Sequence, residues 1–210
     1  MKHIDLREKR GSAKDLALTP KERKKLNNEL TDKKDRIIFL LGCYGGLRVE
    51  EISQCRFSWL ERTEFNGYEV LKIKIPLEDK DTRRPYKKFT QKKEWKTALY
   101  IFENKVINEI WYYYELHKNG LEISRQSITT YRVKPHFEAI LERKITTHAL
   151  RSTFTNYITQ EFRFPNGEKP DLSFVKTLLR HKDIRTTYKH YKTETIAQQE
   201  AYLEGELKQK

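Results

Sequence analysis

Apolar and polar residues follow two different periods along the chain. Residues 68–76, YEVLKIKIP, alternate between the two kinds and contain several β-branched side chains, which predicts a strand. Residues 97–102, TALYIF, are the expected partner strand. On both sides of this pair, apolar positions recur at the spacing of a helix. The pattern therefore predicts a mainly α domain with a small antiparallel β-sheet inserted near its centre.

Start and stop signals place the helices. Thr19, Pro20 and Glu22 form a capping box at the first helix start. A second helix begins near Asp32 and stops at the glycine pair 45–46, and a third runs directly on from residue 47 to about 55. Further helices are predicted over residues 104–117, 127–141, 147–162 and 173–179, with a loop at 163–172 and a short segment ending near 191.

The chain of 210 residues divides into three parts by composition. Residues 1–18 are polar and are expected to be a leader or a residual interdomain linker. Residues 19–191 carry the periodic segments and fit one domain. Residues 192–210 are predicted to form a charged tail, either frayed or exchanged between protomers.

The charge of the chain is strongly positive. There are 43 Lys+Arg against 30 Asp+Glu, which gives a formal net charge of +13. A surface adapted to heat or to an AT-rich genome would explain many charges, but not their single sign. The excess favours nucleic acid as the partner.

Other classes fit the sequence less well. Cys43 and Cys55 lie in or beside apolar segments, as small core residues do, and do not suggest a disulfide framework. No apolar run reaches the roughly 18 residues that span a bilayer, and residues 1–5 do not begin a signal peptide. The six histidines lack the consistent spacing of metal ligands, so no metal site is expected. We expect a cytoplasmic protein without a membrane partner.

Five residues stand in contexts that suit phosphate chemistry. His148 and Arg151 lie three apart near a predicted helix start, and Arg48 follows a glycine pair at another helix start. His181 follows an apolar run at a predicted helix C-terminus, and Tyr191 ends a tyrosine cluster. Taken singly, each of them fits a solvated surface, a cap or a packing role. Together they can hold a phosphodiester and attack it.

Three blocks carry a resemblance to a known family. They are residues 45–52, GGLRVEEI; residues 147–154, THALRSTF; and residues 178–191, LLRHKDIRTTYKHY. In order and spacing they resemble the catalytic domain of the tyrosine recombinases of the phage-integrase and Xer type. The resemblance spans roughly residues 19–195 and implies the mainly α fold of these DNA breaking–rejoining enzymes. Residues 19–191 would then be a catalytic domain.

The resemblance implies a specific reaction. Arg48, His148, Arg151 and His181 would surround the scissile phosphate, and Tyr191 would attack phosphorus to form a 3′-phosphotyrosyl link with a free 5′-hydroxyl. The step would need neither metal nor ATP and no cofactor. Glu51, the acidic residue three positions after the first arginine, would support the site.

Two roles had competing candidates. The nucleophile of the family follows the third-block histidine by nine or ten residues, which favours Tyr191 over Tyr188, only seven residues on. A hairpin lysine of the family protonates the leaving 5′-oxygen. The candidates for it here are Lys87, Lys88, Lys92, Lys93 and Lys96; our choice is Lys93, with Lys92 second. The remaining lysines, with Lys92 and Lys96 foremost, are expected to contact DNA phosphates.

The chain also departs from the family pattern. Arg180 replaces the glycine that normally precedes the third-block histidine, and it either distorts that turn or adds a DNA contact. The N-terminal helical domain that grips the other face of the duplex is missing, so we expect an excised catalytic domain or a minimal enzyme. The expected partners are double-stranded DNA and further copies of the chain, as a dimer or tetramer on DNA.

The expected source is prokaryotic, viral or plasmid, and the expected role is recombination or integration of a mobile element. Two rival functions remain. One is a topoisomerase IB-like nicking–closing activity, which uses the same chemistry on a single strand. The other is a basic DNA-binding protein that has lost catalysis.

Overall fold

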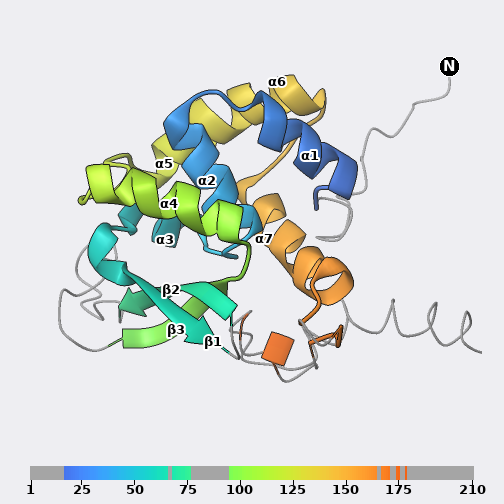
Figure 1. Cartoon of the computed structure of the whole chain (residues 1–210). Coiled ribbons are helices and arrows are strands. Elements are labelled where there is room, and N and C mark those ends of the chain that lie inside the picture. Colours follow the sequence, from blue (N-terminus) through green and yellow to red (C-terminus); the bar gives the residue numbers. More distant parts are fainter. Residues whose placement is uncertain are drawn as a thin grey trace, which may run out of the picture.

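The structure of the chain is a computed structural model that describes residues 17–65, 68–76, 95–164 and 167–170, together with Phe174, Val175 and Leu178. These residues form a mainly helical body with one three-stranded sheet (Figure 1). In chain order the elements are α1 (Pro20–Glu29), α2 (Lys33–Cys43), α3 (Val49–Gln54), the 3₁₀ turn η1 (Phe57–Trp59), β1 (Leu60–Phe65), β2 (Tyr68–Pro76), β3 (Trp95–Ile101), α4 (Asn104–Leu116), α5 (Arg125–Ser127), the π-helical η2 (Ile128–Phe137), α6 (Glu138–Leu141), α7 (Thr147–Asn156) and the π-helical η3 (Tyr157–Glu161).

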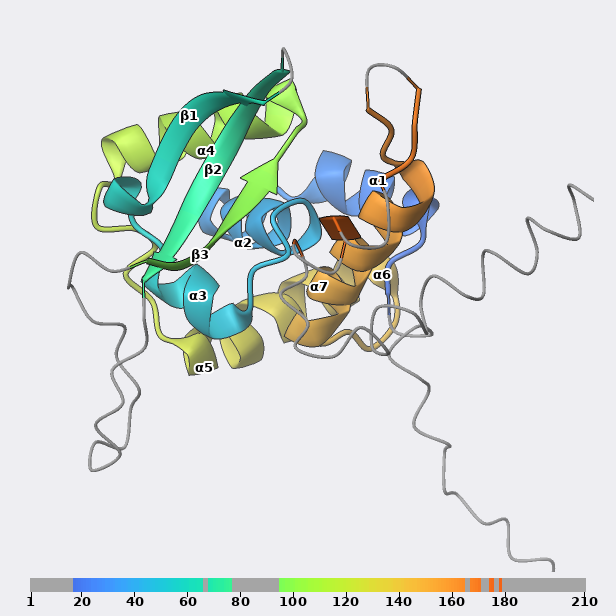
Figure 2. The same ribbon diagram turned by 90° about the horizontal axis from the view of Figure 1, so that it is seen from below.

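Helix α2 is the centre of the fold. Every residue from Ile37 to Cys43 is buried, so this helix is enclosed on all sides instead of along one stripe. Helices α3, α4 and α7 pack around it, and α1 lies beside α6 (Figures 1 and 2). Helix α7 approaches α2 closely because Gly42 has no side chain: a Cβ there would lie 2.7 Å from the Cβ of Leu150. The helix that carries the second sequence block is therefore fixed directly on the core.

The sheet has the order β1-β2-β3 and is antiparallel throughout. The predicted pairing of residues 68–76 with the strand that follows is confirmed, and Leu60, Ile73 and Leu99 form one buried row across the three strands. Strand β1 was not expected, because residues 60–65, LERTEF, are polar between their ends. Its charges have cross-strand partners: Glu61 lies 3.2 Å from the ammonium group of Lys74.

The observed helices agree with the sequence pattern and refine its boundaries. The Thr19–Glu22 capping box is present in full, and Asp32 caps α2 through the N–H groups of its first turn. The third helix begins at Val49, later than expected. The predicted helix over 127–141 is a continuous helical run from 125 that passes through a π-helical stretch around Pro135, which has no N–H to donate. The predicted helix over 147–162 likewise ends in a π-helical turn.

Cys43 and Cys55 are both buried free thiols, as the sequence indicated. Burial raises the pKa of Cys55 to about 12, so this thiol stays protonated at neutral pH. No helix among the described residues has the length and apolar character to cross a membrane. In the same part of the chain, no three or more His, Cys, Asp or Glu side chains gather as metal ligands.

Candidate active site

Arg48 stands at the N-cap of α3 with its side chain about half exposed. Its backbone is extended, and its side chain is 51% exposed. Glu51, one turn later, is 3% exposed and accepts two hydrogen bonds from Arg48: one from the backbone N–H at 2.7 Å and one from Nη1 at 3.3 Å. A buried carboxylate thus fixes both ends of an exposed arginine. Glu51 thus anchors the guanidinium, whereas the neighbouring Glu50 accepts a hydrogen bond from Gln54.

His148 and Arg151 lie one turn apart on α7 in different surroundings. The helix begins at Thr147, and the preceding Thr146 caps it by accepting the N–H of Ala149 at 3.3 Å. His148 is exposed on the first turn, whereas Arg151 is only 7% exposed. Nη1 of Arg151 donates a hydrogen bond to the backbone carbonyl of Gly46. That contact holds the guanidinium against the turn at Gly46.

The turn at Gly46 permits this contact. Gly46 has a φ of +62°, in the left-handed region that side chains disfavour. A Cβ at this position would also lie 2.3 Å from Cδ1 of Phe154, which is fully buried on α7. Two independent constraints therefore require glycine, and with glycine present the turn packs directly against α7. The sequence predicts only that the glycine pair stops a helix, and it does not reveal this packing against α7.

The structure brings the first and second sequence blocks together. Gly46 and Arg151 are 105 positions apart in the sequence, and the guanidinium of Arg151 is hydrogen-bonded to the carbonyl of Gly46. Gly46 itself precedes Arg48 by two residues along the chain. His148 lies on the same helix, one turn nearer its start. The remaining predicted site residues, Lys92, Lys93, Arg180, His181 and Tyr191, lie outside the described residues, as does Tyr188. Lys96 lies in β3, and only its backbone is described.

Two tyrosines close to the turn are packing residues. Burial raises the pKa of Tyr44 to about 12, and it raises the pKa of Tyr157 further. The two rings meet edge to face at 5.4 Å between centroids. The guanidinium of Arg23 lies over both rings, 5.6 Å from that of Tyr44 and 5.2 Å from that of Tyr157. Burial therefore disfavours the phenolate form of both tyrosines.

Comparisons with known proteins bear on the fold. No protein-family model matches the sequence, and neither does any curated protein. Among solved structures, the chain is similar to the crystal structure of XerA recombinase, with 17% identity, a TM-score of 0.57, and coverage of 90% of this chain and 64% of that chain. It is also similar to XerH site-specific recombinase bound to palindromic difH substrate in a post-cleavage complex, with 16% identity, a TM-score of 0.58, and coverage of 89% and 52%.

The chain thus spans between half and two thirds of the length of these two recombinases. At such identities the likeness is one of fold. The sequence motifs and the structural comparison agree on that fold: a mainly helical body with a small antiparallel sheet, as in the catalytic domains of tyrosine recombinases.

Proposed function

We propose that the chain is the catalytic domain of a site-specific DNA recombinase or integrase that cuts and rejoins DNA through a 3′-phosphotyrosyl intermediate. The observation that carries the proposal is the contact of Arg151 with the turn that leads to Arg48. The fold shared with two recombinases and the net charge of +13 support it. One of those recombinases, XerH, is bound to palindromic difH substrate in a post-cleavage complex.

The two arginines suit a phosphodiester, since one contacts the turn that leads to the other. Each guanidinium presents a planar fork of donors that matches two phosphate oxygens. Glu51 orients Arg48, and the carbonyl of Gly46 orients Arg151, so both groups are held before substrate arrives. Charge that develops on the non-bridging oxygens of the pentacoordinate transition state meets donors that need little rearrangement. These side chains take the place of a divalent ion.

The strand transfer follows from this arrangement and the third sequence block. The phenol oxygen of Tyr191 attacks phosphorus, and an imidazole of His148 or His181 accepts its proton. The bond from phosphorus to the 5′-oxygen breaks, and Lys93 protonates the leaving oxygen. Because the phosphotyrosyl bond conserves the energy of the broken bond, a 5′-hydroxyl of another strand reverses the step without ATP. Lys92, Lys96 and Arg180 contact the DNA backbone, and copies of the chain associate on DNA.

The test selects the target DNA sequence of the protein from a random pool. A pool of nicked duplexes with randomised flanks is incubated with the protein in EDTA, and adducts that resist SDS are recovered and sequenced. The proposal predicts an adduct that Tyr191→Phe abolishes and the matched Tyr188→Phe retains. Arg48→Lys and Arg151→Lys each lower its rate of formation by about 10²–10³-fold, because an aligned donor to the transition state is lost.

Each of the other outcomes points elsewhere. An adduct lost in Tyr188→Phe and kept in Tyr191→Phe would move the nucleophile. Duplexes that bind tightly but never form an adduct would favour a DNA-binding protein without catalysis. Relaxation of supercoiled plasmid, without exchange between two recovered duplexes, would favour the nicking–closing activity.

A further inference from the structure

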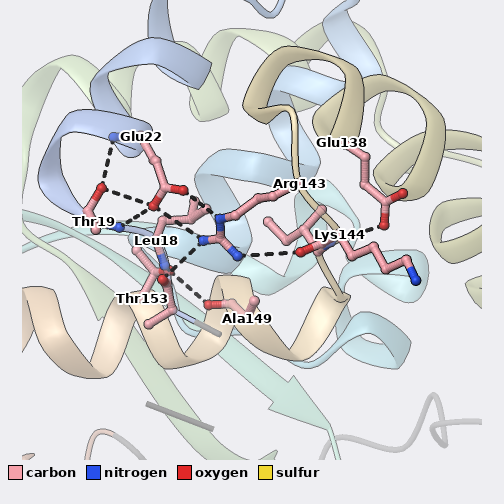
Figure 3. Close-up of polar contacts among 10 residues, drawn as sticks. Leu18, Thr19, Glu22, Glu138, Arg143, Lys144, Ala149 and Thr153 are labelled. Carbon is pink, nitrogen blue, oxygen red and sulfur yellow. Dashed lines mark hydrogen bonds and ion pairs between the residues drawn. The ribbon is translucent and has the colours of Figure 1, made fainter. Parts of the chain in front are cut away.

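The segment that leads into α1, called the incoming chain below, comprises Ala17 and Leu18 and is hydrogen-bonded to the helix that carries His148 and Arg151. Leu18 is 3% exposed, and its N–H donates to Oγ1 of Thr153 on α7 at 2.8 Å (Figure 3). The hydroxyl of Thr153 in turn donates to the carbonyl of Ala149 at 2.8 Å, in the first turn of α7. The incoming chain and the start of the candidate catalytic helix therefore share one buried hydroxyl.

Arg143 joins the same incoming chain to the loop before α7. Its Nε donates to Oε1 of Glu22 at 2.5 Å, and its Nη2 donates to Oε2 of Glu22 and to the carbonyl of Ala17, both at 3.2 Å (Figure 3). Glu22 also holds the start of α1, since it accepts the N–H of Thr19 at 2.8 Å. The hydrogen bond from Arg143 is the main reason that the pKa of Glu22 falls to about 2. This fork ties three segments together at one point.

The loop from Arg143 to the start of α7 is short and fixed along its length. Glu142 ends α6 in a left-handed conformation, with a φ of +56°. The N–H of Ile145 donates to Oε1 of Glu138 at 3.0 Å, and the Ile145 side chain is 1% exposed. Thr146 then caps α7. Arg143 supplies the attachment of this loop to α1 and to the incoming chain, five residues before His148.

We propose that Arg143 is a positioning residue for the reaction: by clamping the loop to Glu22 and Ala17, it sets the place of the first turn of α7 and so of the His148 imidazole. The inference rests on the proposed function, because it gives His148 a role at the phosphate. It also links the site to the segment that leads into α1, because Ala17 is bonded to Arg143 and Leu18 is bonded to Thr153. A shift of about 1 Å in a reacting group can cost about 10²-fold in rate.

A second fork in the same fold serves as the matched control. Arg36 on α2 bonds both carboxylate oxygens of Glu109 and both the carbonyl and the side chain of Asn27, and so fastens α1 and α4 to α2. Like Arg143, it joins helices through a bidentate ion pair. Unlike Arg143, it has no contact with the loop before α7. Arg143→Lys and Arg36→Lys remove the same fork geometry at two places, and only one of these adjoins His148.

The kinetic arm uses the duplex recovered from the pool. For Arg143→Lys we expect the single-turnover rate of adduct formation at saturating duplex to fall about tenfold, with half-saturation within about twofold of the unmodified chain. Glu22→Gln, which keeps the side-chain shape and removes the charge, should reproduce the direction of the effect. Arg36→Lys should leave both quantities within about twofold. Equal losses of rate in Arg143→Lys and Arg36→Lys would overturn the proposal, since a general fastening role would then suffice.

The second arm does not depend on catalysis. In protein labelled at histidine, the ring signal of His148 is assigned by its loss in His148→Gln. We expect that signal to move in Arg143→Lys and Glu22→Gln and to stay in place in Arg36→Lys. An unmoved His148 signal in Arg143→Lys overturns the positioning role. If the unmodified chain forms no adduct with any duplex, the proposed function fails, and the spectra still decide whether Arg143 positions His148.

Discussion

Replacement of Gly46 by alanine tests the packing of the turn before Arg48 against α7, the helix that carries His148 and Arg151. A non-glycine residue at a φ of +62° costs about 1–2 kcal/mol from the left-handed conformation alone. The added Cβ would also meet three ring atoms of Phe154, at 2.3, 2.7 and 2.9 Å. Because that ring is fully buried and cannot swing away, the overlap adds about 1–3 kcal/mol. We expect Gly46→Ala to lower the free energy of unfolding by about 2–5 kcal/mol.

Urea denaturation followed by circular dichroism measures the change, and a second glycine provides the control. Gly167 also has a positive φ, of 82°, but a Cβ there would have no atom within 4 Å. Gly167→Ala should therefore cost only the conformational part, about 1–2 kcal/mol. In a Phe154→Ala background, the cost of Gly46→Ala should shrink by about 1–3 kcal/mol, since the ring that it strikes is gone.

The same substitution displaces the carbonyl that holds Arg151, so adduct formation should fall further in Gly46→Ala than in Gly167→Ala at equal folded fraction. Equal destabilisation by the two alanines would refute the packing part of this reasoning. An unchanged rate of adduct formation in folded Gly46→Ala would refute the link from the turn to Arg151.

Three further predictions concern the rest of the body. The pKa of Glu22 is about 2 in the folded chain against an ordinary 4.5, so the unfolded chain binds more protons between these pH values. The stability that this carboxylate contributes, about 1 kcal/mol after solvent screening, is present above pH 4.5 and lost towards pH 2. Melting curves of the unmodified chain and Glu22→Gln should therefore converge as the pH falls; a constant gap would contradict this. Cys43 and Cys55 should react with a disulfide reagent only in the urea range where the chain unfolds, because burial raises both thiol pKa values; fast reaction in the native state would contradict the packing. Asp35→Asn, at a buried carboxylate with a guanidinium and an imidazole as partners, should cost about 3 kcal/mol by urea denaturation. Asp32→Asn keeps a cap that asparagine also satisfies and loses a partly exposed ion pair with Arg132, so it should cost less than about 1 kcal/mol; equal effects of the two would show that burial does not set the cost.

Much of the fold follows from local patterns in the sequence. The capping box at Thr19, the alternation in residues 68–76 and the helical spacing of residues 104–117 each describe an element by itself, and each element is found. Strand β1 was missed because its pairing with β2 depends on cross-strand charges, which a single segment does not reveal. The π-helical stretches were not predicted either: Ile128–Phe137 contains Pro135, which has no N–H to donate, and Tyr157–Glu161 has no comparable local signal.

The candidate site likewise has features that the sequence predicts and features that only the structure shows. The types and order of Arg48, His148 and Arg151 can be read along the chain, because short blocks carry them. The contact of Arg151 with Gly46 cannot be predicted from such blocks, because it joins positions 105 apart through the packing of α7 on a turn. Nor does sequence identify Arg143, whose partners lie in α1 and in the chain before it. An arginine in a loop of a chain with 43 basic residues gives no local signal.

The decisive test of the proposed function is the chemical identity of the bond between protein and DNA. Adduct formed in EDTA with the recovered duplex is digested with nuclease and protease, and the modified peptide is sequenced by mass spectrometry. We expect a nucleotide joined through its 3′-phosphate to the phenol oxygen of Tyr191, with a free 5′-hydroxyl on the released strand. A link to another residue, a 5′-phosphoryl attachment, or a requirement for a divalent ion would contradict the proposed function.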